Sequence, residues 1–109
     1  MARAAIGALR ARLDIERPVD TPDGAGGLAR SWVVVASVFA EIRPVSGDER
    51  LMADRMEQAV THRITLRAPA VLTSVMRFRA GSRVFAIRSV VDPDERGARL
   101  TCLCEEARP

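Results

Sequence analysis

Between residues 76 and 106 the chain alternates apolar with polar or charged residues. In Met76–Ala80, Arg77 and Arg79 separate the apolar positions. Two further stretches share this period of two, with inward faces formed by Phe85, Ile87 and Val91 and by Leu100, Cys102 and Cys104. Such alternation is typical of strands with one buried face. Turn residues separate the stretches at Ala80-Gly81-Ser82 and at 92–97, so we predict a three-stranded antiparallel meander whose apolar face needs further strands to cover it.

Three further strands are predicted before the meander. A short strand covers 13–17 and ends at Pro18, which cannot donate to a ladder. Ser31–Arg43 is apolar on both faces, which predicts a kink near Ala36-Ser37 and surplus apolar surface at a subunit interface. Val60–Arg67 alternates again, with His62, Ile64 and Leu66 inward and Arg63, Thr65 and Arg67 outward.

Two segments between these strands are candidate contact sites. Asp20–Arg30 is a Gly-rich stretch whose spacing fits no phosphate-binding motif, so we expect a flexible loop or a long hairpin tip. Ser46 and Glu49 form a capping-box pattern before a short helix over 48–58 with a narrow apolar stripe. Because the core does not need these excursions, their candidate partner contacts are Asp23, Gly24, Gly26, Gly27, Leu51, Met52, Arg55 and Met56.

The predicted fold is mainly β: about six strands in a small antiparallel barrel or curved sheet, with one short helix and a long Gly-rich loop. Closure into a barrel leaves no long free edges. The 109 residues are expected to form one domain, with residues 1–6 as a flexible extension. No apolar run approaches the ~18 residues of a membrane span, and early arginines interrupt any signal sequence. We therefore expect a non-exported chain without membrane contact.

The charge pattern leaves one alternative function open. All 17 cations are Arg, and the net charge is +3. A small OB-like or SH3-like barrel could bind nucleic acid through outward-facing Arg63, Arg67, Arg77, Arg79, Arg83 and Arg88. Against this reading, the arginines are dispersed among 14 acidic residues and only four aromatic residues could stack on bases.

Candidate chemistry is sparse. Cys102 and Cys104 lie two apart on one strand face, which disfavours a disulfide, and only His62 could join them at zinc. We therefore interpret the cysteines as small buried hydrophobic residues and His62 as a strand-end residue. With no nucleophile–base pair and no cofactor loop in the pattern, we expect no enzyme, no metal and no cofactor.

The order of several short motifs resembles the phage head–tail joining proteins, also called head-closure or stopper proteins. The motifs are Gly7-x-Leu9-Arg10-x-Arg12-Leu13-x-Ile15-Glu16-Arg17-Pro18, Asp23-Gly24-x-Gly26-Gly27, Trp32, Val38-Phe39-Ala40-x-Ile42, Pro44-x-Ser46-Gly47, Thr61-His62-Arg63-Ile64, Met76-Arg77, Arg83-Val84-Phe85-x-Ile87 and Asp92-Pro93-Asp94-Glu95-Arg96. They cover nearly the whole chain; the longer start, residues 1–6, departs from the family.

The resemblance implies a structural protein of a virion or phage-like particle, such as a gene transfer agent, assembled in the bacterial cytoplasm. Members form a ring, usually of six, between the portal or its adaptor and the tail-terminator ring. Packaged DNA passes through the channel, and the ring helps to retain it and to dock the tail. In such proteins the segment matching 44–58 lies toward the ring or channel.

Overall fold

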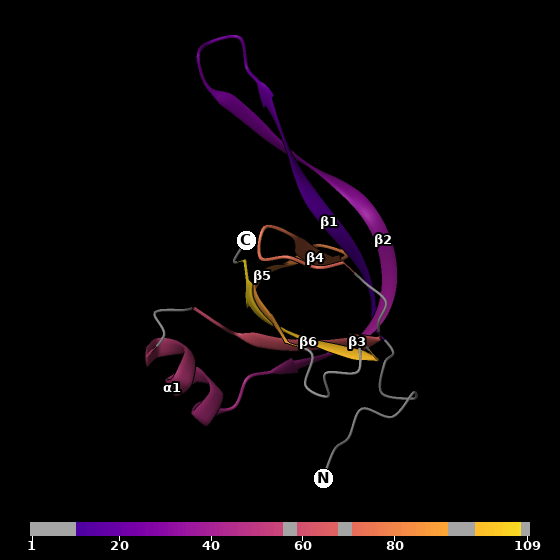
Figure 1. Ribbon diagram of the computed structural model, residues 1–109, viewed down its shortest axis with the longest axis vertical. Helices are drawn as coiled ribbons and strands as arrows, with labels where there is room; N and C mark the ends of the chain where they lie inside the picture. Colours follow the sequence, from indigo (N-terminus) through magenta and orange to yellow (C-terminus); the bar gives the residue numbers. More distant parts are fainter. Residues whose placement is uncertain (1–10, 56–58, 68–70, 92–97, 108–109) are drawn as a thin grey trace.

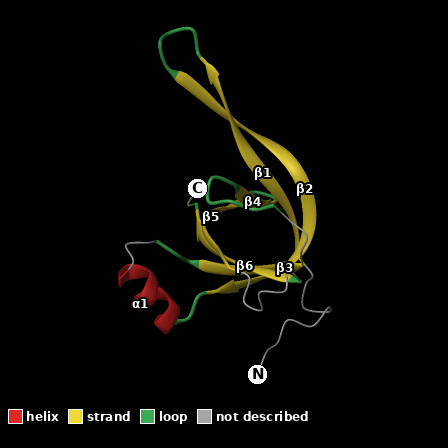
Figure 2. Cartoon of the chain, viewed as in Figure 1, coloured by secondary structure: helices red, strands yellow, loops and turns green. Residues whose placement is uncertain are grey.

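The described part of the chain, residues 11–55, 59–67, 71–91 and 98–107 of a computed structural model, folds as a six-stranded antiparallel barrel with one helix (Figures 1 and 2). The strands follow one another around the barrel in the order β1-β2-β3-β6-β5-β4. The mainly β fold predicted from the sequence is therefore confirmed. The elements are β1 (Ala11–Pro22), β2 (Leu28–Pro44), α1 (Gly47–Arg55), β3 (His62–Arg67), β4 (Arg77–Ala80), β5 (Arg83–Val91) and β6 (Arg99–Glu106).

The barrel closes because β1 pairs with two strands. It pairs with β2 along one edge and with β4 along the other, where Asp14, Ile15 and Glu16 face Arg79, Phe78 and Arg77. The predicted meander is present as β4-β5-β6, with Gly81 turning the chain at a φ of 62°. β3 completes the ring between β2 and β6.

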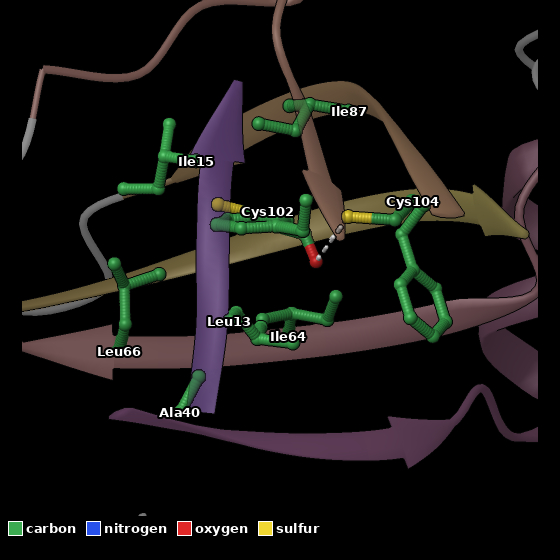
Figure 3. Close-up of a cluster of buried hydrophobic side chains, with 10 residues drawn as sticks. Leu13, Ile15, Ala40, Ile64, Leu66, Ile87, Cys102 and Cys104 are labelled. Carbon is green, nitrogen blue, oxygen red and sulfur yellow. Dashed lines mark hydrogen bonds between the residues drawn. The ribbon is translucent and has the colours of Figure 1, made fainter. Parts of the chain in front are cut away.

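The barrel interior is a compact apolar cluster (Figure 3). Cys102 and Cys104 are fully buried in it, as predicted, and both are free thiols. Burial raises the pKa of Cys102 to about 12 and also raises the pKa of Cys104, so both thiols stay protonated at neutral pH. The cluster consists of Leu13, Ile15, Ala40, Ile64, Leu66, Phe78, Phe85, Ile87, Cys102 and Cys104.

Two β-bulges change which residues face the core. In β2, Ile15 pairs with Ala36 but Glu16 pairs with Val34, so Val35 is an extra residue beside the predicted kink. In β5 the register shifts between Ile87 and Ser89. That second bulge reverses the alternation, and the prediction that Val91 faces inward is wrong: it is 47% exposed, while Val90 packs against the core.

The prediction that Pro18 ends the first strand is also wrong, because β1 continues to Pro22. The pairing of β1 with β4 stops at Glu16. Pro18 lies beyond that point, so its missing N–H removes no hydrogen bond to β4. The Gly-rich loop is correspondingly shorter than expected and spans only 23–27, between β1 and β2. The two strands project beyond the barrel as a two-stranded ribbon (Figure 1), which we call the arm and define as residues 17–35.

The helix and β3 follow their predicted places with two differences. α1 begins where predicted, with Arg50 N–H donating to the Ser46 carbonyl at 3.0 Å. It ends at Arg55, and the predicted continuation over 56–58 lies outside the described residues. Thr65, predicted to face outward, is buried, since its short side chain lies between cross-strand neighbours on both sides.

Candidate functional site

The base of the arm is fixed to the barrel by a buried carboxylate. Glu16 lies where β1 leaves the barrel; its Oε1 accepts from Arg77 Nε at 2.7 Å and its Oε2 from Arg79 Nε at 3.1 Å. The Glu16 side chain is only 7% exposed. The Arg77 guanidinium also stacks 4.0 Å from the centroid of the Trp32 ring. One arginine of β4 therefore holds both strands of the arm at its base.

The shaft and tip of the arm are ordered by two aspartates. Asp20 receives a two-pronged bond from Arg30, from Nε at 2.7 Å and from Nη2 at 3.0 Å. Asp23 Oδ1 accepts the backbone N–H groups of Ala25 at 2.8 Å and Gly27 at 3.0 Å. These bonds lower the pKa of both carboxyl groups, through Arg30 for Asp20 and through the backbone donors for Asp23.

The tip itself is a tight turn. Gly24 and Gly26 have φ values of 82° and 85°, which side-chain-bearing residues rarely adopt. A Cβ on Gly27 would lie 2.8 Å from Asp23 Oδ2. The backbone of the turn therefore favours glycine at 24 and 26, and at 27 a larger residue would displace the Asp23 side chain. Contact of these three glycines with a partner stays a prediction.

The arm and the adjoining part of β2 expose an unusual amount of apolar surface. Between 41% and 68% of each of five side chains is exposed: Leu28, Val33, Val34, Val35 and Phe39. The Arg12 guanidinium lies 5.9 Å from the centroid of the Phe39 ring. The sequence predicted surplus apolar surface at a subunit interface on this strand, but these residues were not among the candidate contact residues. Their exposure now identifies β2 as the largest candidate contact surface.

The helix supplies a second, separate apolar surface. Leu51 is 53% and Met52 57% exposed, and Arg55 is also exposed. Met56, predicted to join them, lies outside the described residues. In Figure 1 the helix lies beside the barrel, away from the projecting arm. The structure therefore does not bring the two sets of predicted contact residues together.

A groove of about 610 Å³ lies between the base of the arm and the outer surface of β4 and β5. Its polar groups are largely satisfied: Arg30 is bonded to Asp20, Arg77 to Glu16 and Arg88 to Glu105. Its apolar lining comes from Pro18, Trp32, Val75, Met76, Val84, Ala86 and Ala107. Such a groove can accept apolar side chains from a partner more readily than an anion.

The arginines proposed for nucleic-acid binding are mostly paired with carboxylates. Arg77 and Arg79 bind Glu16, Arg83 binds Glu106 in a fork at 2.8 and 3.1 Å, and Arg88 binds Glu105. A paired guanidinium presents little net positive charge to a phosphate backbone, and binding of this kind depends on clustered positive charge. The structure gives this alternative no added support.

His62 lies at the start of β3, as expected for a strand-end residue. Its Nδ1 is 2.9 Å from Thr61 Oγ1, and its ring packs edge-on against Phe85 at 5.3 Å between centroids. Partial burial lowers its pKa, although Glu106, 3.9 Å away, opposes the shift. Within the described ranges, no group of three or more His, Cys, Asp or Glu side chains could hold a metal ion. In the same part of the chain, no helix has the length and apolar character needed to cross a membrane.

Comparison with known proteins gives one matching family and several matching solved structures. Residues 4–107 match the family model described as phage head completion protein. A chain from the virion of a native gene transfer agent particle is 30% identical, with a TM-score of 0.61 over 91% of this chain and 96% of that one. The solution structure of protein SF1141 from Shigella flexneri 2a is 27% identical, with a TM-score of 0.72 over 93% and 95%. No curated protein matches the sequence.

Proposed function

The chain belongs to the phage head completion protein family, and we propose that it forms a ring in the neck of a tailed phage or gene transfer agent particle. Family membership makes it a structural protein of a phage-type head. In the proposed role, a ring of about six copies lies below the portal or its adaptor and above the tail-terminator ring. The ring surrounds the DNA channel, helps to retain the packaged genome and provides the surface on which the tail docks.

One observation supports this role most directly: the arm and α1 carry exposed apolar side chains that do not belong to the core cluster. Val33, Val34 and Val35 on the arm and Leu51 and Met52 on α1 are all substantially exposed. Contiguous exposed apolar side chains mark protein–protein contacts. Because the two surfaces are separate (Figure 1), one copy can contact two different neighbours, as a subunit of a ring stacked between other rings must.

In this proposal the barrel, the arm and α1 have different roles. The closed barrel acts as the rigid body that packs beside its neighbours. The arm, held at a fixed angle by Glu16 and Arg77, extends to an adjoining ring. The helix segment turns toward the neighbouring subunit or the channel. We expect the exposed apolar area of both segments to be buried only in the assembled particle.

Two variants test this division in particles rather than in the isolated chain. In the first, Leu51 and Met52 are both changed to Ser; in the second, the turn over 23–27 is shortened. Both chains should stay folded by circular dichroism, since neither segment contributes to the core cluster. Particles that carry either variant should show fewer attached tails by electron microscopy and should lose packaged DNA.

Val71→Ser is the matched control, because Val71 is 83% exposed but belongs to neither segment. It should leave tail attachment and DNA retention unchanged. Native mass measurement of the assembly, alone and with the portal complex, tests the ring itself. Fully functional particles with both variants, or a native assembly with no ring, would contradict the proposal.

A further inference from the structure

The arm has two long strand edges that nothing in the described chain covers. β1 pairs with β4 only as far as Glu16, so the outer edge of 17–22 has no partner strand there. β2 pairs with β3 only from Ala40 onward, so the outer edge of 28–39 likewise has none. The remaining described strands pair on both sides over at least part of their length, and β5 pairs with β4 only as far as Ala86. An unpaired edge exposes a row of backbone donors and acceptors and is a template for another strand.

The β1 edge is blocked by prolines. The turn closes with Asp23 N–H donating to the Gly27 carbonyl at 3.1 Å. Since donors alternate along an antiparallel strand, the nitrogen atoms of Pro18, Asp20 and Pro22 face away from β2. Two of these three positions have no N–H. An incoming strand would therefore find a single donor, at Asp20, along this edge.

The β2 edge is open. By the same alternation, the N–H groups of Leu28, Arg30, Trp32 and Val34 face outward, and none of these residues is proline. Ser31–Ala40 contains no charged residue. Exposed valines at 33, 34 and 35 lie along the same edge. From Ser31 onward the edge therefore lacks the proline or charge that usually protects an edge strand, although the β-bulge at Val35 adds some twist.

We infer that the β2 edge of the arm pairs antiparallel with the β2 edge of a second copy, about a two-fold axis near Val34. Within the arm, a like edge is the open edge available to a second copy, because the β1 edge is blocked by prolines. Arg30 is the single charged residue in 28–39, and in this register it lies beside Val38 and Phe39 of the other copy, so no like charges meet. The exposed valines of the two arms cover one another.

The difference between the blocked β1 edge and the open β2 edge limits the number of copies that can join through this contact. Pairing two β2 edges produces a four-stranded sheet whose outer strands are both β1. Each outer edge then carries Pro18 and Pro22. Further copies cannot add through this contact, so it ends at a dimer and does not extend into a fibre.

The dimer is a state of the free chain and does not depend on the proposed role in particles. A two-fold contact uses the same surface on both copies, whereas a ring repeats a contact between two different surfaces. The β2–β2 contact therefore protects the apolar arm before assembly and must open when the chain enters a ring. Its failure would leave the proposed function untouched.

A charge placed at the two-fold axis tests the contact. In Val34→Lys, two lysines face one another, and we expect the dimer dissociation constant to rise by about 100-fold or more. The wild-type chain should be a dimer by light scattering coupled to size exclusion, and the folded variant a monomer. Val19→Lys places the same charge on the blocked strand of the same arm and should remain a dimer.

Cross-linking locates the contact independently. Val34→Cys should form a disulfide-linked dimer under mild oxidation, while Val19→Cys should not; the native cysteines are fully buried and do not compete. A wild-type chain that is monomeric at millimolar concentration would overturn the inference and show that the bulge at Val35 suffices to block the edge. A folded Val34→Lys chain that remains dimeric, or equal cross-linking at both positions, would overturn it as well.

Discussion

β1 and β2 belong to both the barrel and the arm, yet their residues are paired and buried differently in the two regions. Inside the barrel, Leu13 and Ile15 of β1 are buried at 0% and 2% exposure, and each strand pairs on both sides. A few residues later, both faces of the same ribbon are exposed and its edges have no described partner strand. Along β2, the arm part (28–35) is at least as apolar in sequence as the barrel part (36–44). This difference in burial indicates that packing in the barrel stabilises the fold. The exposed apolar side chains of the arm are instead available for contact with other molecules.

The largest expected change in the free energy of unfolding comes from replacing a leucine in the barrel, compared with the same replacement in the arm. Leu13→Ala removes a fully buried side chain from the barrel and should lower the free energy of unfolding by about 2–5 kcal/mol. Leu28→Ala makes the same change on the arm, where the side chain is 68% exposed, and should stay within about 0.5 kcal/mol of wild type. Urea denaturation followed by circular dichroism measures both. A large loss for Leu28→Ala would mean that the arm belongs to the core.

Glu16→Gln tests the junction between the two regions. The substitution keeps the shape of the side chain but removes the charge that Arg77 and Arg79 share, and we expect a loss of about 2 kcal/mol. The single tryptophan, Trp32, stacks on Arg77, so its fluorescence should report loosening of the arm. Asp20→Asn is the control, since its exposed pair with Arg30 should leave the denaturation midpoint unchanged. Unaltered stability and fluorescence in Glu16→Gln would show that the arm needs no anchor.

One glycine in each region adopts a positive φ, which would strain the backbone of any other residue placed there. Gly81 in the barrel turn and Gly24 at the arm tip have φ values of 62° and 82°, with open space where a Cβ would lie. Gly81→Ala should lower the free energy of global unfolding by about 1 kcal/mol, because the β4–β5 turn is part of the barrel. Gly24→Ala should leave the global midpoint unchanged and increase amide exchange only along the arm. Equal effects on the global midpoint would mean that barrel and arm unfold as one unit.

The smallest expected effect is a pH response confined to the arm tip. The pKa values of Asp20 and Asp23 are lowered from 3.8, so their contribution is fully present above pH 3.8 and is lost as the pH falls through the lower, folded values. Amide shifts of Ala25 and Gly27 should titrate with a midpoint below 3.8, while those of Ile64 in the core stay constant. Asp23→Asn should abolish the tip titration. A midpoint at or above 3.8 would contradict the bonding seen at the tip.

The sequence was sufficient to predict the strands that alternate strictly. The meander, β3 and the burial of both cysteines follow from a period of two, because a half-buried strand must place alternate side chains in the core. The start of the helix was predicted from its cap, and the Ser46 carbonyl accepts the first helical hydrogen bond, from the Arg50 N–H. Exposure of Leu51 and Met52 agrees with the narrow apolar stripe seen in the sequence.

The features that the sequence did not reveal all depend on pairing between distant residues. The bulge before Ser89 reverses the alternation that placed Val91 inside. The continuation of β1 past Pro18 depends on where β4 stops, and the role of Glu16 depends on arginines 61 and 63 residues away. The candidate glycines were recognised as a group, but their task in the turn required the φ values and the position of Asp23.

The closure of the barrel between β1 and β4 also has a consequence for synthesis. It rests on three residue pairs whose members, such as Glu16 and Arg77, are separated by 61 positions. The β1–β2 hairpin can form as soon as both strands have left the ribosome, but closure must wait until β4 has been made. Contacts of such long range slow folding. Until β4 has been made, the β1 edge at Asp14–Glu16 therefore has no partner strand, and the sheet stays open.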